Sequence, residues 1–204
     1  MAPPPFTTLE TIAAPFDIAV VDTDQIIPVR FIRTPRARGY GPMLFHDLRY
    51  DESGCERPDF VLNQASFRAA GVLVADSDFG TGSSREQAVW ALVDRGIRCV
   101  LAGDFGDIFF NNAINHGLLL IRESREVLAD VRAALHRAPG TKVAVDLDQQ
   151  LWGIEGSAPR RFEIEAPRRR RLILGLDEIE MTRQLRAEID VFDAAYRRRR
   201  SWLF

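Results

Sequence analysis

Residues 71–95 read Gly-Val-Leu-Val-Ala-Asp-Ser-Asp-Phe-Gly-Thr-Gly-Ser-Ser-Arg-Glu-Gln-Ala-Val-Trp-Ala-Leu-Val-Asp-Arg. The apolar run at 71–75 predicts a buried strand, and the amphipathic segment that ends at Arg95 predicts a helix. Between them, Gly80 and Gly82 make positive φ angles available, as a sharp turn from strand to helix requires. This strand–turn–helix unit indicates an α/β fold.

The polar residues of this turn have two interpretations. Ser83, Ser84 and Arg85 offer hydroxyls and a guanidinium where a helix leaves amide N–H groups free, which suits a small carboxylate. Ser83 with Glu86, and Ser84 with Gln87, also fit the spacing of a capping box, which would only close the helix end. On their own, these residues favour capping. The turn matches neither the P-loop nor the dinucleotide-binding glycine pattern.

The rest of the chain alternates strands and helices. Strands are expected at 18–21, 72–75, 99–102 and 118–121, and a hairpin through 156–159 is expected to join strands at 143–147 and 161–165. Helices are expected to end near Arg95 and to cover 107–117, 123–136 and 176–199. Residues 28–58 are rich in Arg, Pro and Gly without a period, so they predict a long loop.

Length and composition are typical of one compact domain. The chain has 204 residues, of which 46% are apolar, enough for a full core. No secretory leader and no run of 18 apolar residues occurs, so we expect a cytoplasmic protein without a membrane partner. The net charge of −2 gives no general attraction to nucleic acid. The arginine runs at 168–171 and 197–200 are expected to be a solvated loop and a charged helix end.

The potential metal ligands are scattered along the chain. Cys55 and Cys99 are far apart and form no Cys-x-x-Cys pair, and the histidines are His46, His116 and His136. The usual ligand sets of an iron–sulfur cluster or a structural zinc ion therefore cannot be assembled from this chain alone.

Three strings of residues identify a family resemblance. They are Asp-Thr-Asp-Gln-Ile-Ile-Pro at 22–28, Phe-Gly-Thr-Gly-Ser-Ser-Arg-Glu-Gln-Ala at 79–88, and Asp-Ile-Phe-Phe-Asn-Asn-Ala-Ile-Asn-His-Gly-Leu-Leu at 107–119. In order and spacing they resemble the small subunits of 3-isopropylmalate dehydratase, which correspond to the swivelling domain of aconitase. The resemblance implies one aconitase-type swivelling β/β/α domain over 1–204. It also implies a mobile substrate loop at about 28–58 and a C-terminal helix at about 176–199.

The resemblance also implies an activity and a partner. Such small subunits belong to heteromeric hydro-lyases that convert 2-isopropylmalate into 3-isopropylmalate by dehydration and rehydration in leucine biosynthesis. The expected partner is a large subunit that carries a [4Fe-4S] cluster, and this chain would bind no cofactor itself. The substrate would be a small hydroxy-acid.

By resemblance, Ser83 would be the catalytic base that removes a proton next to a carboxylate, and Arg85 would hold that carboxylate by a two-point contact. The substrate-binding residues that the resemblance implies are Asp24, Thr23, Gly82, Ser84 and Arg85.

The chain departs from the leucine-pathway pattern at two positions. Thr81 and Gln87 stand where Cys and His are usual, and the string at 79–88 is closer to that of homoaconitase. Homoaconitate, citraconate or maleate therefore stay open as substrates, as does a non-catalytic module that keeps the fold. The presence of Asp24, Ser83 and Arg85 together favours an enzyme.

The segment 30–49 is expected to carry substrate selectivity. An isopropyl group needs an apolar wall, whereas an additional carboxylate needs an arginine, and the segment holds both kinds of residue. The apolar candidates are Phe31, Ile32, Tyr40, Met43, Leu44 and Phe45, and they favour the branched aliphatic substrate.

Overall fold

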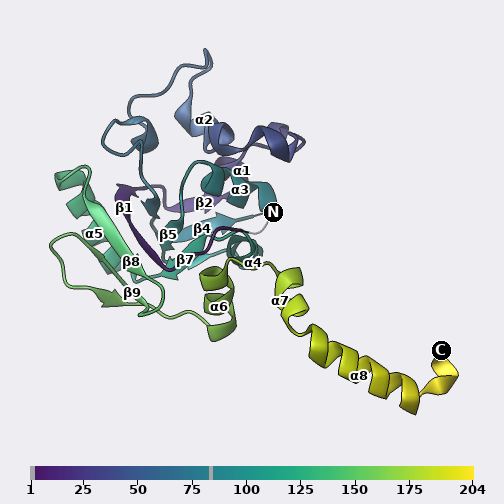
Figure 1. The fold of residues 1–204 in the computed structure, drawn as a ribbon. Helices are drawn as coiled ribbons and strands as arrows, with labels where there is room; N and C mark the ends of the chain where they lie inside the picture. The colour runs from purple at the N-terminus through teal and green to yellow at the C-terminus, as the bar shows by residue number, and fades with distance from the viewer. Residues whose placement is uncertain (1–2, 83–84) are drawn as a thin grey trace.

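The computed structural model of the protein describes residues 3–82 and 85–204. Within these residues, seven strands form a mixed sheet in the order β10-β9-β8-β1-β3-β5-β7 (Figure 1). Their bounds are Arg160–Arg161 for β10, Leu151–Ile154 for β9, Lys142–Asp146 for β8, Thr8–Pro15 for β1, Val72–Val74 for β3, Cys99–Ala102 for β5 and Leu119–Arg122 for β7. The half from β1 to β7 is parallel and the half from β10 to β1 is antiparallel.

A second, smaller sheet continues the parallel half. In the described residues its order is β2-β4-β6, all parallel, with bounds Val20–Asp22, Asp78–Thr81 and Asp104–Phe105. Each of these strands follows a strand of the larger sheet along the chain: β2 follows β1, β4 follows β3, and β6 follows β5. The carboxyl ends of β2, β4 and β6 therefore meet at one edge.

Some helices lie at this edge, and others pack against the sheets or against other helices. The helices near the edge are α1 (Thr23–Ile26), α3 (Glu86–Asp94) and α4 (Asp107–Asn115). Helix α5 (Arg125–Arg137) packs against β1, β3 and β5, and Ser124 caps it by accepting the Val127 N–H. Helix α6 (Ala166–Leu174) packs against α4.

The segment between β2 and β3 is built of single turns of helix rather than of featureless loop. The turns are η1 (Val29–Phe31), η2 (Arg36–Arg38), η3 (Gly41–Met43), α2 (His46–Arg49) and η4 (Val61–Asn63). An aromatic cluster ties the segment to the core, because the Phe45 ring lies 4.7 Å from Phe16 and 6.5 Å from Phe79. All three rings are at most 1% exposed.

Several expected elements are confirmed and some are wrong. The strand at 99–102 is β5, and the helices at 107–117 and 123–136 are α4 and α5. The hairpin is wrong: β8 pairs with β9 through a turn in which Gln150 has a φ of 55°, and only the short β10 follows. Strand β1 was not expected, although it lies in the middle of the larger sheet.

The C-terminal third also differs from expectation. The arginine run at 168–171 lies inside α6, which begins with Ala166 and Pro167, ends at Leu174 and is followed by Gly175, whose φ is 62°. Proline in the first turn and a left-handed glycine after the last turn explain these limits. The expected helix at 176–199 is two helices, α7 (Glu178–Gln184) and α8 (Arg186–Arg199). None of the described helices is long and apolar enough to span a bilayer.

Candidate active site

The three strings that identified the family resemblance meet at the carboxyl edge of the smaller sheet. β2 ends at Asp22 and leads into α1, β4 ends at Thr81 and leads toward α3, and β6 ends at Phe105 and leads into α4. The crevice outside the carboxyl ends of parallel strands is where α/β proteins bind their ligands. Segments far apart in sequence therefore supply one site.

An ion pair joins two of the expected substrate-binding residues. Arg85 Nη1 donates to Asp24 Oδ1, which links the start of α3 to α1. The Arg85 side chain is only 13% exposed and the Asp24 side chain is 51% exposed. A guanidinium carries five N–H donors in a planar fork, so one contact with Asp24 is compatible with a second carboxylate on another edge.

Helix α1 places Thr23 and Asp24 at this edge through a capping box. Asp22 accepts the Gln25 N–H at 2.7 Å, and the Gln25 side chain accepts the Asp22 N–H at 3.0 Å. Asp22 is therefore a cap. Thr23 is 1% exposed and lies beside the glycine turn, because a Cβ added to Gly82 would be 3.9 Å from its Oγ1.

Four of the expected site residues are thus brought together: Thr23, Asp24, Gly82 and Arg85. Ser83, expected as the base, and Ser84, expected to bind substrate, lie outside the described residues. The capping interpretation of these two serines lies outside them as well. Arg85 itself occupies the N-cap position of α3, with an extended backbone at φ −135° and ψ 110°.

The glycine turn has the predicted backbone geometry. Gly80 and Gly82 have φ angles of 73° and 85°, in the region that side chains rarely adopt. A Cβ on Gly80 would overlap the ring of Phe109, and a Cβ on Gly106 would overlap the Gly80 carbonyl oxygen. The turn therefore packs against α4 at a distance that only glycine allows.

A second polar contact at the start of α3 was not predicted. Trp90 Nε1 lies 3.1 Å from Nε2 of His116, at the end of α4, and Glu86 Oε1 lies 2.5 Å from the same nitrogen. The two contacts are alternatives, because Nε2 accepts from the indole N–H only without a proton and donates to the carboxylate only with one. From the sequence, Glu86 was a possible capping-box residue and His116 a potential metal ligand, and both belong to the family strings, but nothing indicated that they meet. Their contact fixes the first turn of α3 against α4.

The other end of α3 holds the segment 28–58. Asp94 accepts from both Nη atoms of Arg36, at 2.5 and 2.7 Å, and from the Tyr40 N–H at 2.6 Å. The hydrogen bonds that Arg36 donates to Asp94 raise the pKa of Arg36. A Cβ on Gly41 would lie 2.8 Å from the Asp94 carbonyl oxygen, so the chain packs directly on the helix end. An acid in the last turn of a helix opposes the helix dipole, and this anomaly is the signal by which Asp94 could have been found.

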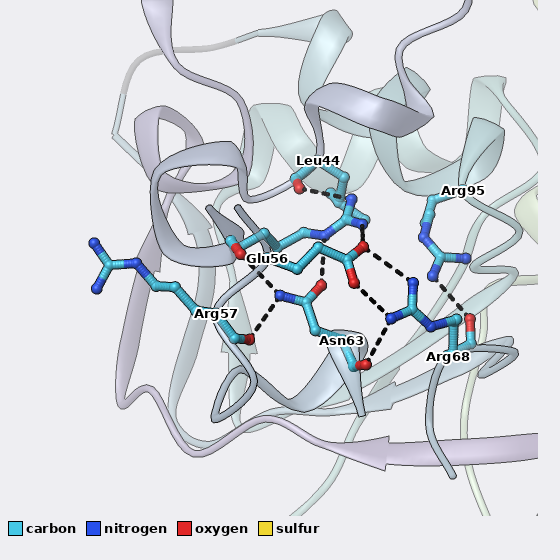
Figure 2. Close-up of polar contacts among 7 residues, drawn as sticks. Leu44, Glu56, Arg57, Asn63, Arg68 and Arg95 are labelled. Atoms are coloured by element: carbon cyan, nitrogen blue, oxygen red, sulfur yellow. Dashed lines mark hydrogen bonds and ion pairs between the residues drawn. The ribbon is translucent and has the colours of Figure 1, made fainter. Parts of the chain in front are cut away.

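A cluster of arginines fixes the far end of the same segment. Glu56 lies between two arginines: Arg68 donates to it at 2.5 and 3.0 Å (Figure 2), and an Nη atom of Arg49 lies 3.8 Å from its carboxylate. The hydrogen bond from Arg68 lowers the pKa of Glu56. Burial lowers the pKa of Arg95, as do the charges of Arg49 and Arg68, and Arg95 donates to the Arg68 carbonyl at 2.8 Å. The cluster holds the end of the segment 28–58 against the residues that follow it and against the end of α3.

The structure changes the expected apolar wall. Tyr40, Leu44 and Phe45 are at most 1% exposed and belong to the core, so they cannot line a substrate pocket as they stand. The partly buried residues Phe31 and Met43 pack at the edge of the core.

The contact of Asp94 with Arg36 yields a prediction. Asp94→Asn removes the charged half of the contact with Arg36, and a hydrogen bond to a charged group contributes about 1.5 to 3 kcal/mol. We expect trypsin to cleave after Arg33, Arg36 and Arg38 about tenfold faster or more, since 1.4 kcal/mol corresponds to a factor of ten. Cleavage rates measured on the native protein by mass spectrometry test this.

The matched control is Asp47→Asn. Asp47 pairs with Arg30, and both side chains of that pair are more than half exposed, so its loss should change the cleavage rate little. If trypsin cleavage were accelerated equally in the two variants, Asp94 would not stabilise the segment more than an exposed ion pair does.

The potential metal ligands stay apart in the structure. Cys99 is fully buried in β5, where burial raises its pKa, and Cys55 is exposed. The described part of the chain contains no group of three or more His, Cys, Asp or Glu side chains placed to hold a metal ion.

Comparison with known proteins shows to which family the chain is related. Residues 3–126 match the Aconitase C-terminal domain family. A "3-isopropylmalate dehydratase small subunit" from Gluconacetobacter diazotrophicus is 46% identical over 197 residues, which is 97% of this chain and 95% of the relative. One of the same name from Rhodopseudomonas palustris is 44% identical over 198 residues, covering 97% of this chain and 98% of the relative.

The fold agrees with these relatives. The crystal structure of a 3-isopropylmalate dehydratase from Methanocaldococcus jannaschii superposes with a TM-score of 0.65 at 28% identity, covering 91% of this chain and 99% of the other. The expected aconitase-type swivelling fold is thereby confirmed. The chain belongs to the aconitase C-terminal domain family, among the 3-isopropylmalate dehydratase small subunits.

Proposed function

We propose that this chain is the small subunit of a heteromeric hydro-lyase that converts 2-isopropylmalate into 3-isopropylmalate in leucine biosynthesis. The names of relatives that align over nearly the whole chain support it. The observation that carries it is the ion pair of Arg85 with Asp24, beside Thr23 and Gly82, at the carboxyl edge of three parallel strands. This is the arrangement that a carboxylate substrate needs.

In this proposal Arg85 holds a substrate carboxylate and Ser83 removes the proton on the adjacent carbon. A serine hydroxyl is a poor base, and a helix N-terminus contributes only about 0.3 to 2 kcal/mol toward its alkoxide. That energy would lower the pKa of the serine hydroxyl by roughly one unit, which is too little for the hydroxyl to act as a base at neutral pH. The cation of Arg85 and the exclusion of water in a closed complex supply the remainder. The isolated chain should therefore be inert.

The proposed partner is a large subunit that carries a [4Fe-4S] cluster. The described residues of this chain offer no ligand set for such a cluster, so they fit a division in which the cluster sits on the partner and faces the edge with Asp24 and Arg85. When bound, the cluster supplies a Lewis acid for the hydroxyl that leaves and returns. This chain contributes carboxylate binding and the proton transfer.

Among the possible substrates, the apolar residues of the segment favour isopropylmalate. Arg30 pairs with Asp47, Arg36 pairs with Asp94, and Arg49 is buried beside Asn63, which leaves Arg33 and Arg38 as exposed arginines that an additional carboxylate would need. The departures at 81 and 87 leave Arg85 and Asp24 in place, and the Thr81 hydroxyl donates to a carbonyl of β2 at 3.4 Å. We infer that the segment 28–58 presents Phe31, Ile32 and Met43 to the branched side chain.

The test is a substrate panel on the complex reconstituted with the large subunit. We expect kcat/KM to be highest for isopropylmalate, above citraconate, maleate and homoaconitate. A tricarboxylate preferred by more than about a hundredfold would refute the assignment, since one methylene changes discrimination by only about 10- to 200-fold. Activity of this chain without any partner would refute the division of labour.

A further inference from the structure

The last part of the chain exposes large apolar side chains. We call residues 178–204 the C-terminal arm; it comprises α7, α8 and the final turn η5 (Ser201–Leu203). In Figure 1 the arm, drawn in yellow, extends away from the sheets. Ile189 is 41% exposed, Phe192 is 68% exposed and Trp202 is 73% exposed. Exposed apolar surface gathered in this way marks an interaction site.

Few contacts hold the arm to the rest of the protein. Its hydrogen bonds to α6 come from α7: Arg171 donates to Glu178, and Arg170 donates to Gln184. Across the described residues, the main packing partners of α8 are its neighbours α7 and η5. An isolated helix of this length is marginal in water, because packing supplies most of the stability of a helix. Helix α8 therefore lacks the surface that would stabilise it.

Three large apolar side chains of α8, together with Leu185 just before it, form one stripe. Leu185, Ile189, Phe192 and Tyr196 follow a spacing of four, three and four residues, which places them on one face. The rings of Phe192 and Tyr196 are stacked 5.9 Å apart, and the Phe204 ring lies 6.2 Å from Tyr196 and extends the stripe. This is the pattern of a helix that lies in an apolar groove.

We propose that the C-terminal arm is the docking element for the large subunit, with the stripe lying in an apolar groove of that subunit whose rim is acidic. The inference rests on the proposed function, from which the existence of the large subunit follows. It goes further by assigning the contact to one element of this chain. The relatives align over 97% of the chain, so the arm belongs to what small subunits of this family share.

The charge of the arm favours the large subunit over a second copy of this chain as its binding partner. Four consecutive arginines, 197–200, end α8. Parallel pairing of two arms would place the run against itself. Antiparallel pairing that aligns the stripes, with Ile189 opposite Phe192, would place the run opposite residues 181–184, which include Arg183. Arg197 already pairs with Asp193 within α8. Neither arrangement places an acid opposite the other three arginines, whereas an acidic rim on a different protein would.

The experiment compares two variants of the full chain. Ile189→Asp with Phe192→Asp places charges on the stripe, and Val191→Asp places one on the opposite face, where Val191 is 72% exposed. The dissociation constant from the large subunit is measured by biolayer interferometry. We expect the stripe variant to bind at least about a hundredfold more weakly, as for the loss of anchor side chains. The Val191 variant should bind like the wild type.

Further measurements decide between the outcomes. Circular dichroism should show an unchanged melting temperature for the sheet domain, since the stripe lies outside it. Unchanged affinity of the stripe variant would overturn the inference. So would a wild-type chain that sediments as a dimer and becomes monomeric only in the stripe variant, because a second copy would then be the occupant.

The inference and the proposed function fail separately. At saturating large subunit, the stripe variant should recover the kcat of the wild type, because the arm lies away from Asp24 and Arg85. A wild-type complex that forms but does not act on isopropylmalate would refute the proposed function and leave the docking result intact. A stripe variant that binds normally would refute the docking alone.

Discussion

Ser83→Ala is expected to lower kcat of the reconstituted complex by about 10²- to 10⁴-fold, the range that general acid–base groups contribute. The substrate's KM should change little, because Arg85 still holds the carboxylate. The measurement is steady-state kinetics at saturating large subunit, together with the melting temperature of the isolated chain. If the serine only caps α3, the variant would lose about 0.5 to 2 kcal/mol of stability and keep its activity.

Arg85→Lys separates binding from proton transfer. Lysine keeps the charge and loses the planar two-point contact, so KM should rise more than kcat falls. The ion pair with Asp24 can be kept by a lysine, which makes a large change in folding stability unexpected. Equal loss of kcat in both variants, with KM unchanged, would contradict the assignment of separate roles.

Gly80→Ala is expected to destabilise the protein by about 2 to 5 kcal/mol. A left-handed conformation costs a residue with a Cβ roughly 1 to 2 kcal/mol, and overpacking a core costs about 1 to 3 kcal/mol more. Both apply here, because Gly80 has a φ of 73° and a Cβ would overlap the Phe109 ring in a buried contact between β4 and α4. Urea unfolding of the isolated chain measures the loss.

Gly82→Ala is the matched control. Gly82 has a φ of 85°, but the nearest atom to an added Cβ is the Asp22 Cβ at 3.6 Å, an ordinary contact. Only the conformational cost of roughly 1 to 2 kcal/mol should appear. If the two variants unfold at the same urea concentration, the close approach of Phe109 contributes nothing.

Local sequence patterns predicted the elements whose conformation depends on their own residues. The strand–turn–helix at 71–95, its positive-φ glycines and the strand β5 follow from apolar runs and turn residues. Strand β1 was missed because its Thr-Leu-Glu-Thr-Ile-Ala-Ala-Pro sequence has weak strand propensity, and two neighbouring strands determine its conformation. The hairpin was misplaced because the turn after β8 contains no glycine, while 156–159 carries strong turn residues.

The same limit applies to the site. The contact between Asp24 and Arg85 joins residues 61 positions apart. The family resemblance indicated that both bind substrate, and nothing in the sequence indicated that they pair with each other. Asp94 binds Arg36 across 58 positions, and no local pattern specifies such a partner. The break at Leu185 between α7 and α8 has no proline or glycine to mark it.

The position of β1 in the larger sheet has a consequence for synthesis on the ribosome. One edge of β1 pairs with β3, but the other waits for β8, and the contact between Glu10 and Lys142 spans 132 positions. At about 5 to 20 residues per second, that edge stays open for roughly 7 to 26 seconds while the chain emerges. A charge on an open strand edge discourages pairing with other chains. The charge of Glu10 therefore disfavours pairing of the nascent strand with other chains during this interval. Once β8 has been synthesised, it pairs with β1, and Lys142 Nζ lies 2.9 Å from the Glu10 carboxylate.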